Sequence, residues 1–144
     1  MIDFTYIEPQ DLCLKLKNKR NKENDIIIVD VRDDDFIGGH IKGALHIPSY
    51  ELSSHILNLI EETKDAKEII FYCSFSQQRG PSGARLFLKE RQKIHNIKEI
   101  QEKHIFPKVY VLRGGFVEWQ KKYGNDEELT DKYNKELWEK NLWI

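Results

Sequence analysis

The chain has 144 residues but only two cysteines, one methionine and four prolines, and it lacks any hydrophobic run long enough to span a bilayer. So few cysteines exclude a small scaffold held together by disulfides, and neither a zinc-type Cys/His spacing nor an Asn-x-Ser/Thr acceptor occurs. The net charge of -1 excludes bulk electrostatic attraction to nucleic acid or to an anionic membrane. We therefore expect a protein of a reducing compartment, in the cytoplasm or the nucleus, without a metal, nucleic-acid or membrane partner.

What is present is the composition of an ordinary globular domain, with 40% hydrophobic and 33% charged residues. A chain of this length suits one domain with one core. We expect a single domain over 1–144, a monomer or weak dimer, with its core at about 3–123. The tail, 124–144, ends in tryptophans and is expected to pack on the domain; docking to a partner is the alternative. With Asp3 close behind Met1, no apolar leader is expected.

Short β-branched runs alternate along the chain with amphipathic stretches. This alternation predicts an α/β fold in which a central, mostly parallel sheet carries helices on both faces. We expect strands at residues 5–7, 26–31, 69–72 and 109–112. We expect helices from Pro9, over 50–62, from Arg79 to about 93 and over 116–123, with a charged connector over 94–107.

The most informative segment reads C-S-F-S-Q-Q-R-G-P from Cys73 to Pro81, between a predicted strand and a predicted helix. Backbone N–H groups at a helix N-terminus bind anions, and an arginine adds two parallel hydrogen bonds to phosphate-type oxygens and favours a thiolate nearby. We therefore predict Cys73 and Arg79 as catalytic residues of an oxyanion site; an inert buried cysteine is the alternative for Cys73 alone. The phosphate-binding loop would comprise Ser74, Phe75, Ser76, Gln77, Gln78 and Gly80.

Other residues near this loop are expected to shape the site rather than to react. Asp30 and Arg32 lie at the end of a buried strand, where charges need partners, so we expect them to pair with each other. His40 is expected to be a hydrogen-bonded loop residue, because no second ligand or adjacent carboxylate accompanies it. Gly114 and Gly115 would form a turn that tolerates positive φ.

Four segments together resemble the rhodanese superfamily, and the resemblance covers most of residues 3–123. They are D-V-R at 30–32, G-H-I-K-G-A at 39–44, C-S-F-S-Q-Q-R-G-P at 73–81 and L-R-G-G-F at 112–116, followed by Trp119. The loop is similar to that of the M-phase inducer phosphatases, and more so to that of their small fungal dual-specificity relatives. The resemblance implies a rhodanese-like fold and hydrolysis of phosphotyrosine-like or other phosphate monoesters, with a phosphoprotein, small phosphoester or oxyanion as substrate.

In this interpretation Cys73 attacks phosphorus and forms a thiophosphate intermediate, while Arg79 and the loop amides hold the equatorial oxygens. No cofactor is implied. An arsenate reductase with the same loop is the alternative, with glutathione or glutaredoxin as its reductant. A sulfurtransferase is less favoured because sulfurtransferases of this superfamily have a loop one residue shorter. A non-catalytic phosphate-binding domain stays open.

The sequence departs from the family pattern at three positions. Tyr72 stands where such phosphatases have a histidine before the nucleophile, and Ser74 stands where the M-phase inducers have a glutamate. Val31 replaces a cysteine that forms a protective disulfide in that family. The general acid is therefore unassigned. The candidates are the acidic run 33–35 and Glu51, although surface carboxylates of this kind are usually solvated; alternatively the substrate brings its own proton.

Overall fold

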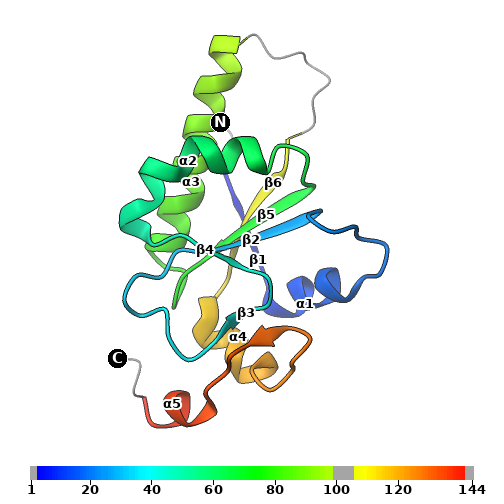
Figure 1. The fold of residues 1–144 in the computed structure, drawn as a ribbon, viewed down its shortest axis with the longest axis vertical. Helices are drawn as coiled ribbons and strands as arrows, with labels where there is room; N and C mark the ends of the chain where they lie inside the picture. Colours follow the sequence, from blue (N-terminus) through cyan, green and yellow to red (C-terminus); the bar gives the residue numbers. More distant parts are fainter. Residues whose placement is uncertain (1–2, 99–105, 142–144) are drawn as a thin grey trace.

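The computed structural model describes residues 3–98 and 106–141, and within them a five-stranded parallel sheet forms the centre of the molecule (Figure 1). Its strands are β1 (Thr5–Ile7), β2 (Ile26–Asp30), β4 (Leu45–His46), β5 (Glu68–Tyr72) and β6 (Lys108–Leu112). Their order across the sheet is β1-β6-β5-β2-β4, and each neighbouring pair is parallel. Two further short strands, β3 (His40–Ile41) and β7 (Thr130–Asp131), pair antiparallel apart from this sheet.

Helices cover both faces of the sheet, as the alternating pattern predicts (Figure 1). They are α1 (Pro9–Lys17), α2 (Ser49–Glu62), α3 (Arg79–Lys98), α4 (Gly115–Tyr123) and α5 (Lys135–Glu139). One buried cluster joins the sheet to α2 and α3, and a second joins its other face to α1, α4 and α5. The predicted α/β class with a central parallel sheet is confirmed.

The central strand β5 shows why two cores form. Its side chains alternate between faces, so Ile69 and Phe71 join the α2–α3 cluster while Ile70 and Tyr72 join the other. All four are fully buried, which explains why a strand covered on both faces reads as one apolar run. In the cluster that contains Ile69 and Phe71, α2 buries the predicted stripe of Leu52, Ile56, Leu59 and Ile60.

Helix α3 is longer than the sequence pattern predicts, because it continues to Lys98 instead of ending near residue 93. The expectation of a connector is therefore wrong for 94–98, while 99–105 lie outside the described residues. Lys, Glu, Arg and Gln are good helix formers, so a charged run does not by itself end a helix. Arg91 also anchors this part of α3, since it donates to the Pro107 carbonyl at 2.8 Å and lies over the Phe87 ring.

The described part of the tail contacts the α4 side of the molecule. Trp138 of α5 packs on the Phe116 ring with centroids 5.4 Å apart, and its Nε1 donates to the Gly38 carbonyl at 2.8 Å. Trp119 of α4 donates to the Thr130 hydroxyl of β7. These contacts fix the segment before β3 from one side.

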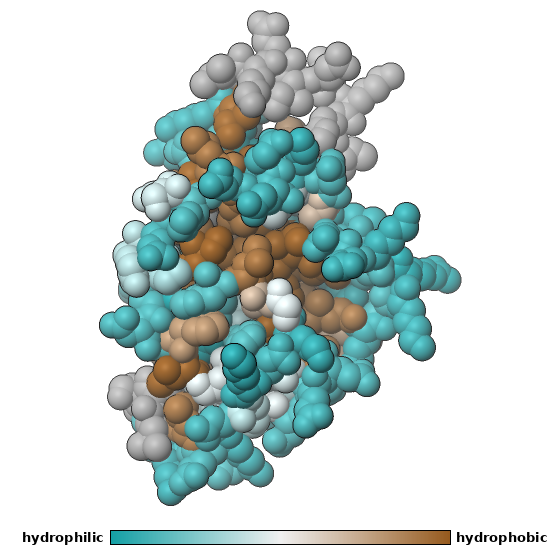
Figure 2. All heavy atoms as spheres, viewed as in Figure 1, coloured by the Kyte–Doolittle hydropathy of each residue, from teal (hydrophilic) through white to brown (hydrophobic). Residues whose placement is uncertain are grey.

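Figure 2 shows hydrophobic residues across the middle of the face where β4 forms the edge of the sheet. Leu45 of β4 is 42% exposed and Ile37 is 38% exposed. In the part of the chain that the structure describes, no helix is both long and apolar enough to cross a bilayer.

Candidate active site

The candidate site lies at the carboxyl ends of β2 and β5, where open α/β sheets place their ligands. The two strands are paired in register, with Asp30 opposite Tyr72, and the Val31 amide continues the ladder by donating to the Tyr72 carbonyl at 2.9 Å. The chain leaves β5 at Cys73 and leaves β2 toward the acidic run. Both segments therefore reach the same edge of the sheet.

The segment between β5 and α3 curls around the sulfur of Cys73. The Ser76 amide approaches Sγ at 3.2 Å and the Gly80 amide approaches it at 3.3 Å. The Cys73 amide in turn donates to the Ser76 hydroxyl at 3.4 Å, and Ser76 holds a positive φ of 55°. Cys73 is 3% exposed. One of these N–H groups therefore belongs to the loop and the other, that of Gly80, to the first turn of α3.

The first turn of α4 holds the beginning of this loop. The Phe116 amide donates to the Cys73 carbonyl and the Val117 amide to the Ser74 carbonyl, both at 3.0 Å. Gly115 comes so close that a Cβ there would lie 2.4 Å from both carbonyl oxygens, and its φ is +60°. Only glycine fits this contact, so Gly115 supports the loop directly.

Arg79 points to the acidic run after β2. Its Nη1 and Nη2 donate to the two carboxylate oxygens of Asp35 at 2.7 and 2.6 Å, and Nη1 lies 3.3 Å from Asp33 Oδ2. The expectation of solvated surface carboxylates is therefore wrong for Asp33 and Asp35, because the parallel ends of β2 and β5 bring them beside Arg79. It fits Asp34, which lies exposed between them.

Hydrogen bonds set the charge of this cluster. The bonds from Arg79 and then Ser74, which donates to Asp35 Oδ2 at 2.6 Å, outweigh burial and hold the pKa of Asp35 well below its usual range. Burial acts to raise the pKa of Asp33, but bonds from the Ser49 hydroxyl and from Arg79 lower it overall. The bond with Asp35 raises the pKa of Arg79. All three groups are ionised near neutral pH.

Asp30 and Arg32 form a second ion pair directly behind the acidic run, with both side chains fully buried. Nε and Nη2 of Arg32 donate to the carboxylate at 2.8 to 3.1 Å, and Nη2 also donates to the Gly39 carbonyl. Nη1 donates to the Ile37 carbonyl at 3.3 Å. The guanidinium lies over the rings of Phe36, Tyr72 and Phe116. This pair fixes the path of residues 33–39.

Tyr72, at the position of the family's histidine, turns away from the nucleophile. Its hydroxyl accepts a hydrogen bond from the Ile41 amide at 3.1 Å, and burial, followed by the charge of Asp30, raises the pKa of Tyr72. Tyr72 therefore brings no positive charge to the loop. His40 lies in β3 with Nε2 3.8 Å from Asp131 of β7, and burial lowers the pKa of His40.

The remaining predicted residues lie around the loop. Phe75 is 46% exposed, and Gln77 and Gln78 are also exposed. Gly114 precedes α4 with a φ of 78°. Glu51, in the first turn of α2, lines a separate hollow beside β4 rather than the surroundings of Arg79.

A hollow of about 320 Å³ opens beside Arg79 between α2 and α3. Small polar and apolar side chains line it: Ser49, Leu52, Ser53, Gln78, Ser82 and Leu86. Sequence reasoning does not single out Ser49, which is the first residue of α2 and whose hydroxyl donates to Asp33.

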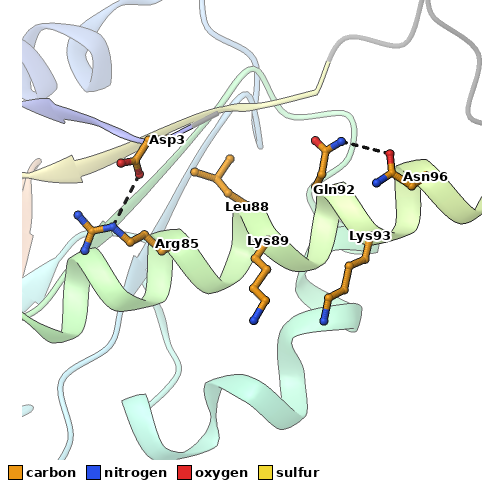
Figure 3. Close-up of a pocket in the computed structure, with 7 residues that line it drawn as sticks. All are labelled: Asp3, Arg85, Leu88, Lys89, Gln92, Lys93 and Asn96. Atoms are coloured by element: carbon orange, nitrogen blue, oxygen red, sulfur yellow. Dashed lines mark hydrogen bonds and ion pairs between the residues drawn. The ribbon is translucent and has the colours of Figure 1, made fainter. Parts of the chain in front are cut away.

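A larger groove of about 680 Å³ follows α3 from Arg85 toward Asn96, with Lys89 and Lys93 extending from one side of the helix and Leu88 from the other (Figure 3). No residue of the Cys73 loop lines it. Over residues 3–98 and 106–141, no group of three potential metal ligands comes together.

Comparison with known proteins identifies the family. A model described as a rhodanese-like domain matches residues 14–122, and the chain belongs to this family. It is 39% identical over 121 residues to the CDC25-like phosphatase YCH1 of Saccharomyces cerevisiae, covering 77% of this chain and 76% of the relative. It is 34% identical over 139 residues to the dual specificity phosphatase ibp1 of Schizosaccharomyces pombe, covering 91% of this chain and 99% of the relative.

Solved structures agree with this assignment. A yeast protein tyrosine phosphatase of the rhodanese family has a TM-score of 0.71 at 31% identity, covering 96% of this chain and 99% of its own. An As-Sb reductase from Leishmania major has a TM-score of 0.68 at 28% identity, covering 87% of this chain and 82% of its own. The resemblance to phosphatases of the rhodanese superfamily is confirmed, and so is the prediction of a phosphatase-class enzyme.

Proposed function

We propose that the protein is a cysteine-dependent phosphatase that hydrolyses phosphate monoesters, of the protein tyrosine or dual-specificity type. One observation carries the proposal: the loop that begins at Cys73 directs two backbone N–H groups at its sulfur and ends at Arg79, a guanidinium at the same edge of the sheet. A nucleophile, amide donors and a bidentate cation together suit a tetrahedral oxyanion. The hollow beside Arg79 gives room for the leaving group.

In the proposed reaction the Cys73 thiolate attacks phosphorus, an S–P bond forms and the P–O bond to the leaving group breaks. Arg79 and the loop amides stabilise the charge on the equatorial oxygens. Water then attacks the thiophosphate, which releases inorganic phosphate and restores the cysteine. No oxidant, reductant or cofactor takes part in these two steps.

Before a substrate binds, neither Asp33 nor Asp35 has a proton to give to the leaving group, because the bonds from Arg79 and Ser74 keep the pKa of Asp35 low and those from Ser49 and Arg79 lower that of Asp33. We infer that the alcohol leaves with a proton brought by the substrate itself. An aryl phosphate with a stable phenolate leaving group therefore suits this site best.

Arsenate reduction is the second candidate, favoured by the likeness to the As-Sb reductase. Arsenate has nearly the shape and charge of phosphate. Cys73 would displace water from arsenate and form an S–As(V) bond. A thiol of the glutathione class would then attack the Cys73 sulfur, so that the S–As bond breaks, arsenic leaves as arsenite and a mixed disulfide remains on Cys73. A further thiol, of glutathione or glutaredoxin, would reduce that disulfide and restore Cys73. The choice between the two reactions depends on that added thiol.

The test is the hydrolysis of p-nitrophenyl phosphate by the purified chain and by Cys73→Ser. We expect Cys73→Ser to abolish turnover without changing the melting temperature, since serine is a far weaker nucleophile in the same space. Cys13→Ser, which replaces the other cysteine on α1, is the matched control and should keep full activity. An active Cys73→Ser protein would contradict the proposed mechanism.

The same proteins should be tested with arsenate plus glutathione and glutaredoxin, and with thiosulfate plus cyanide. Arsenite formation without ester hydrolysis would favour the second candidate. Thiocyanate formation would favour sulfur transfer. Binding of phosphate without turnover of any of these substrates would favour a non-catalytic phosphate-binding domain.

A further inference from the structure

The carboxylate of Asp35 occupies the guanidinium of Arg79 with both of its oxygens. Oδ1 accepts from Nη1 at 2.7 Å and from the Asp33 amide at 3.0 Å. Oδ2 accepts from Nη2 at 2.6 Å and from the Ser74 hydroxyl at 2.6 Å. Donors from α3, from the Cys73 loop and from the acidic run itself therefore hold this one carboxylate at the entrance to the site.

The two hydrogen bonds from Arg79 to Asp35 have the geometry that an oxyanion substrate would use on the same guanidinium. Two parallel N–H···O bonds to a carboxylate use the same fork of the guanidinium that binds two oxygens of a phosphate. Asp33 does not compete in the same way, because it makes a longer contact with Arg79 and its oxygens accept the Ser49 amide and hydroxyl at 2.7 to 2.9 Å. Asp35 must move off Arg79 before an oxyanion can take both nitrogens.

The pair of Arg79 and Asp35 is also exposed enough for another anion to replace the Asp35 carboxylate. The side chains of Arg79 and Asp35 are 31% and 26% exposed, whereas those of Arg32 and Asp30 are fully buried. A partly exposed pair contributes little to stability and can be replaced by another anion at modest cost. Ser74 and the Asp33 amide would keep the displaced carboxylate close.

We propose that Asp35 competes with substrates for Arg79 and so lowers the affinity of the site for every oxyanion. The inference rests on the proposed oxyanion site of Cys73 and Arg79. Because the same competition applies to all anions, one with few other contacts, such as chloride, is kept from occupying Arg79. A substrate that also contacts the loop amides and the neighbouring hollow overcomes it.

The experiment measures the binding of tungstate, a tetrahedral dianion that is not hydrolysed, by calorimetry. The original chain is compared with Asp35→Asn, which keeps the side-chain shape, and with Asp34→Asn, which removes the same charge from the exposed neighbour. We expect Asp35→Asn to lower the dissociation constant about tenfold, the equivalent of about 1.4 kcal/mol. We expect Asp34→Asn to lower it less than about twofold, since an exposed charge acts only through screened attraction.

Two failures can be told apart. If the original chain binds tungstate and Asp35→Asn binds it no more tightly, Asp35 is not a competitor and only this inference is overturned. If neither protein binds tungstate, the oxyanion site itself is wrong, and the inference falls with the proposed function.

A second measurement avoids substitution altogether, in case Asp35→Asn does not fold. The carboxyl carbon of Asp35 in the original chain is followed by NMR through an acid titration, with and without sulfate, which stays a tetrahedral dianion in mild acid. The groups that face it are Arg79, Asp33, the Ser74 hydroxyl and Cys73 beside Arg79. We expect sulfate to raise the pKa of Asp35, because the anion takes Arg79 away; an unchanged pKa with the site saturated by sulfate would overturn the inference.

Discussion

Two arginine–aspartate pairs lie side by side at the edge of one sheet, and their surroundings differ. Arg32 is buried with Asp30, and its other donors reach backbone carbonyls of the following loop while three rings cover its faces. Arg79 pairs with Asp35 and Asp33 near the surface, beside the Cys73 loop and the hollow between α2 and α3. The first pair is enclosed by partners that cannot leave, whereas the second is held by groups that an incoming anion can replace.

Residue type does not distinguish the structural ion pair from the functional one, because both consist of an arginine and an aspartate. A buried pair must be fully hydrogen-bonded to survive the loss of water. A partly exposed pair needs no such enclosure, and its donors stay available. We infer that exposure and exchangeable partners, rather than the presence of an arginine, mark the functional pair here.

The largest effect is expected from Asp30→Asn. The substitution leaves the buried Arg32 charge without its counterion, so we expect the free energy of unfolding to fall by about 3 to 5 kcal/mol. The same change at Asp35 should lower it by less than about 1 kcal/mol, because that pair is partly exposed. Urea unfolding followed by circular dichroism measures both. Equal losses at the two positions would remove the distinction between the pairs.

The next effect is expected from replacing each arginine by lysine. Arg79→Lys should lower kcat/KM for p-nitrophenyl phosphate by about 100- to 1,000-fold, because lysine cannot provide two parallel hydrogen bonds to the transition state. Its melting temperature should stay near that of the original chain. Arg32→Lys should instead lower the melting temperature clearly. A fully active Arg79→Lys enzyme would mean that the exposed pair is structural after all.

The smallest effect is expected in how the stability of the protein changes at low pH. The pKa of Asp35 is lowered in the folded chain by Arg79 and Ser74, so its contribution to stability is present above about pH 4, the usual pKa of an unfolded aspartate, and is lost as the pH falls further. The stability deficit of Asp35→Asn relative to the original chain should therefore shrink between pH 7 and pH 3. Urea unfolding at several pH values measures this. A deficit that grows on acidification would contradict the sign of the shift.

Much of the fold could be predicted from the chain because its signals are local. The stripe of Leu52 and Ile56 identifies α2 by its period, and the apolar run 69–72 identifies β5 by its short length and its β-branched and aromatic residues. The pairing of β3 with β7 could not be predicted, because each strand has two residues and their partners lie far apart in the sequence. The end of α3 was missed because charged residues favour a helix as much as a solvated connector.

The site could be predicted only in part. Cys73 and Arg79 lie in one short segment, so their spacing is visible in the sequence. Asp35 contacts Arg79 across 44 positions, and an acidic run alone gives no sign of such a partner. The available signal was topological: both segments follow neighbouring parallel strands, whose carboxyl ends share an edge.

The hydrogen bond from Trp138 to Gly38 joins residues 100 positions apart. With the bond from the Asn134 amide to the same carbonyl, it closes a loop that begins at the acidic run. Closing a contact between distant parts of a chain costs entropy, so we expect this closure to form later than the local helices do. During synthesis, the loop that holds Asp35 would gain this support only after the C-terminal helix has left the ribosome.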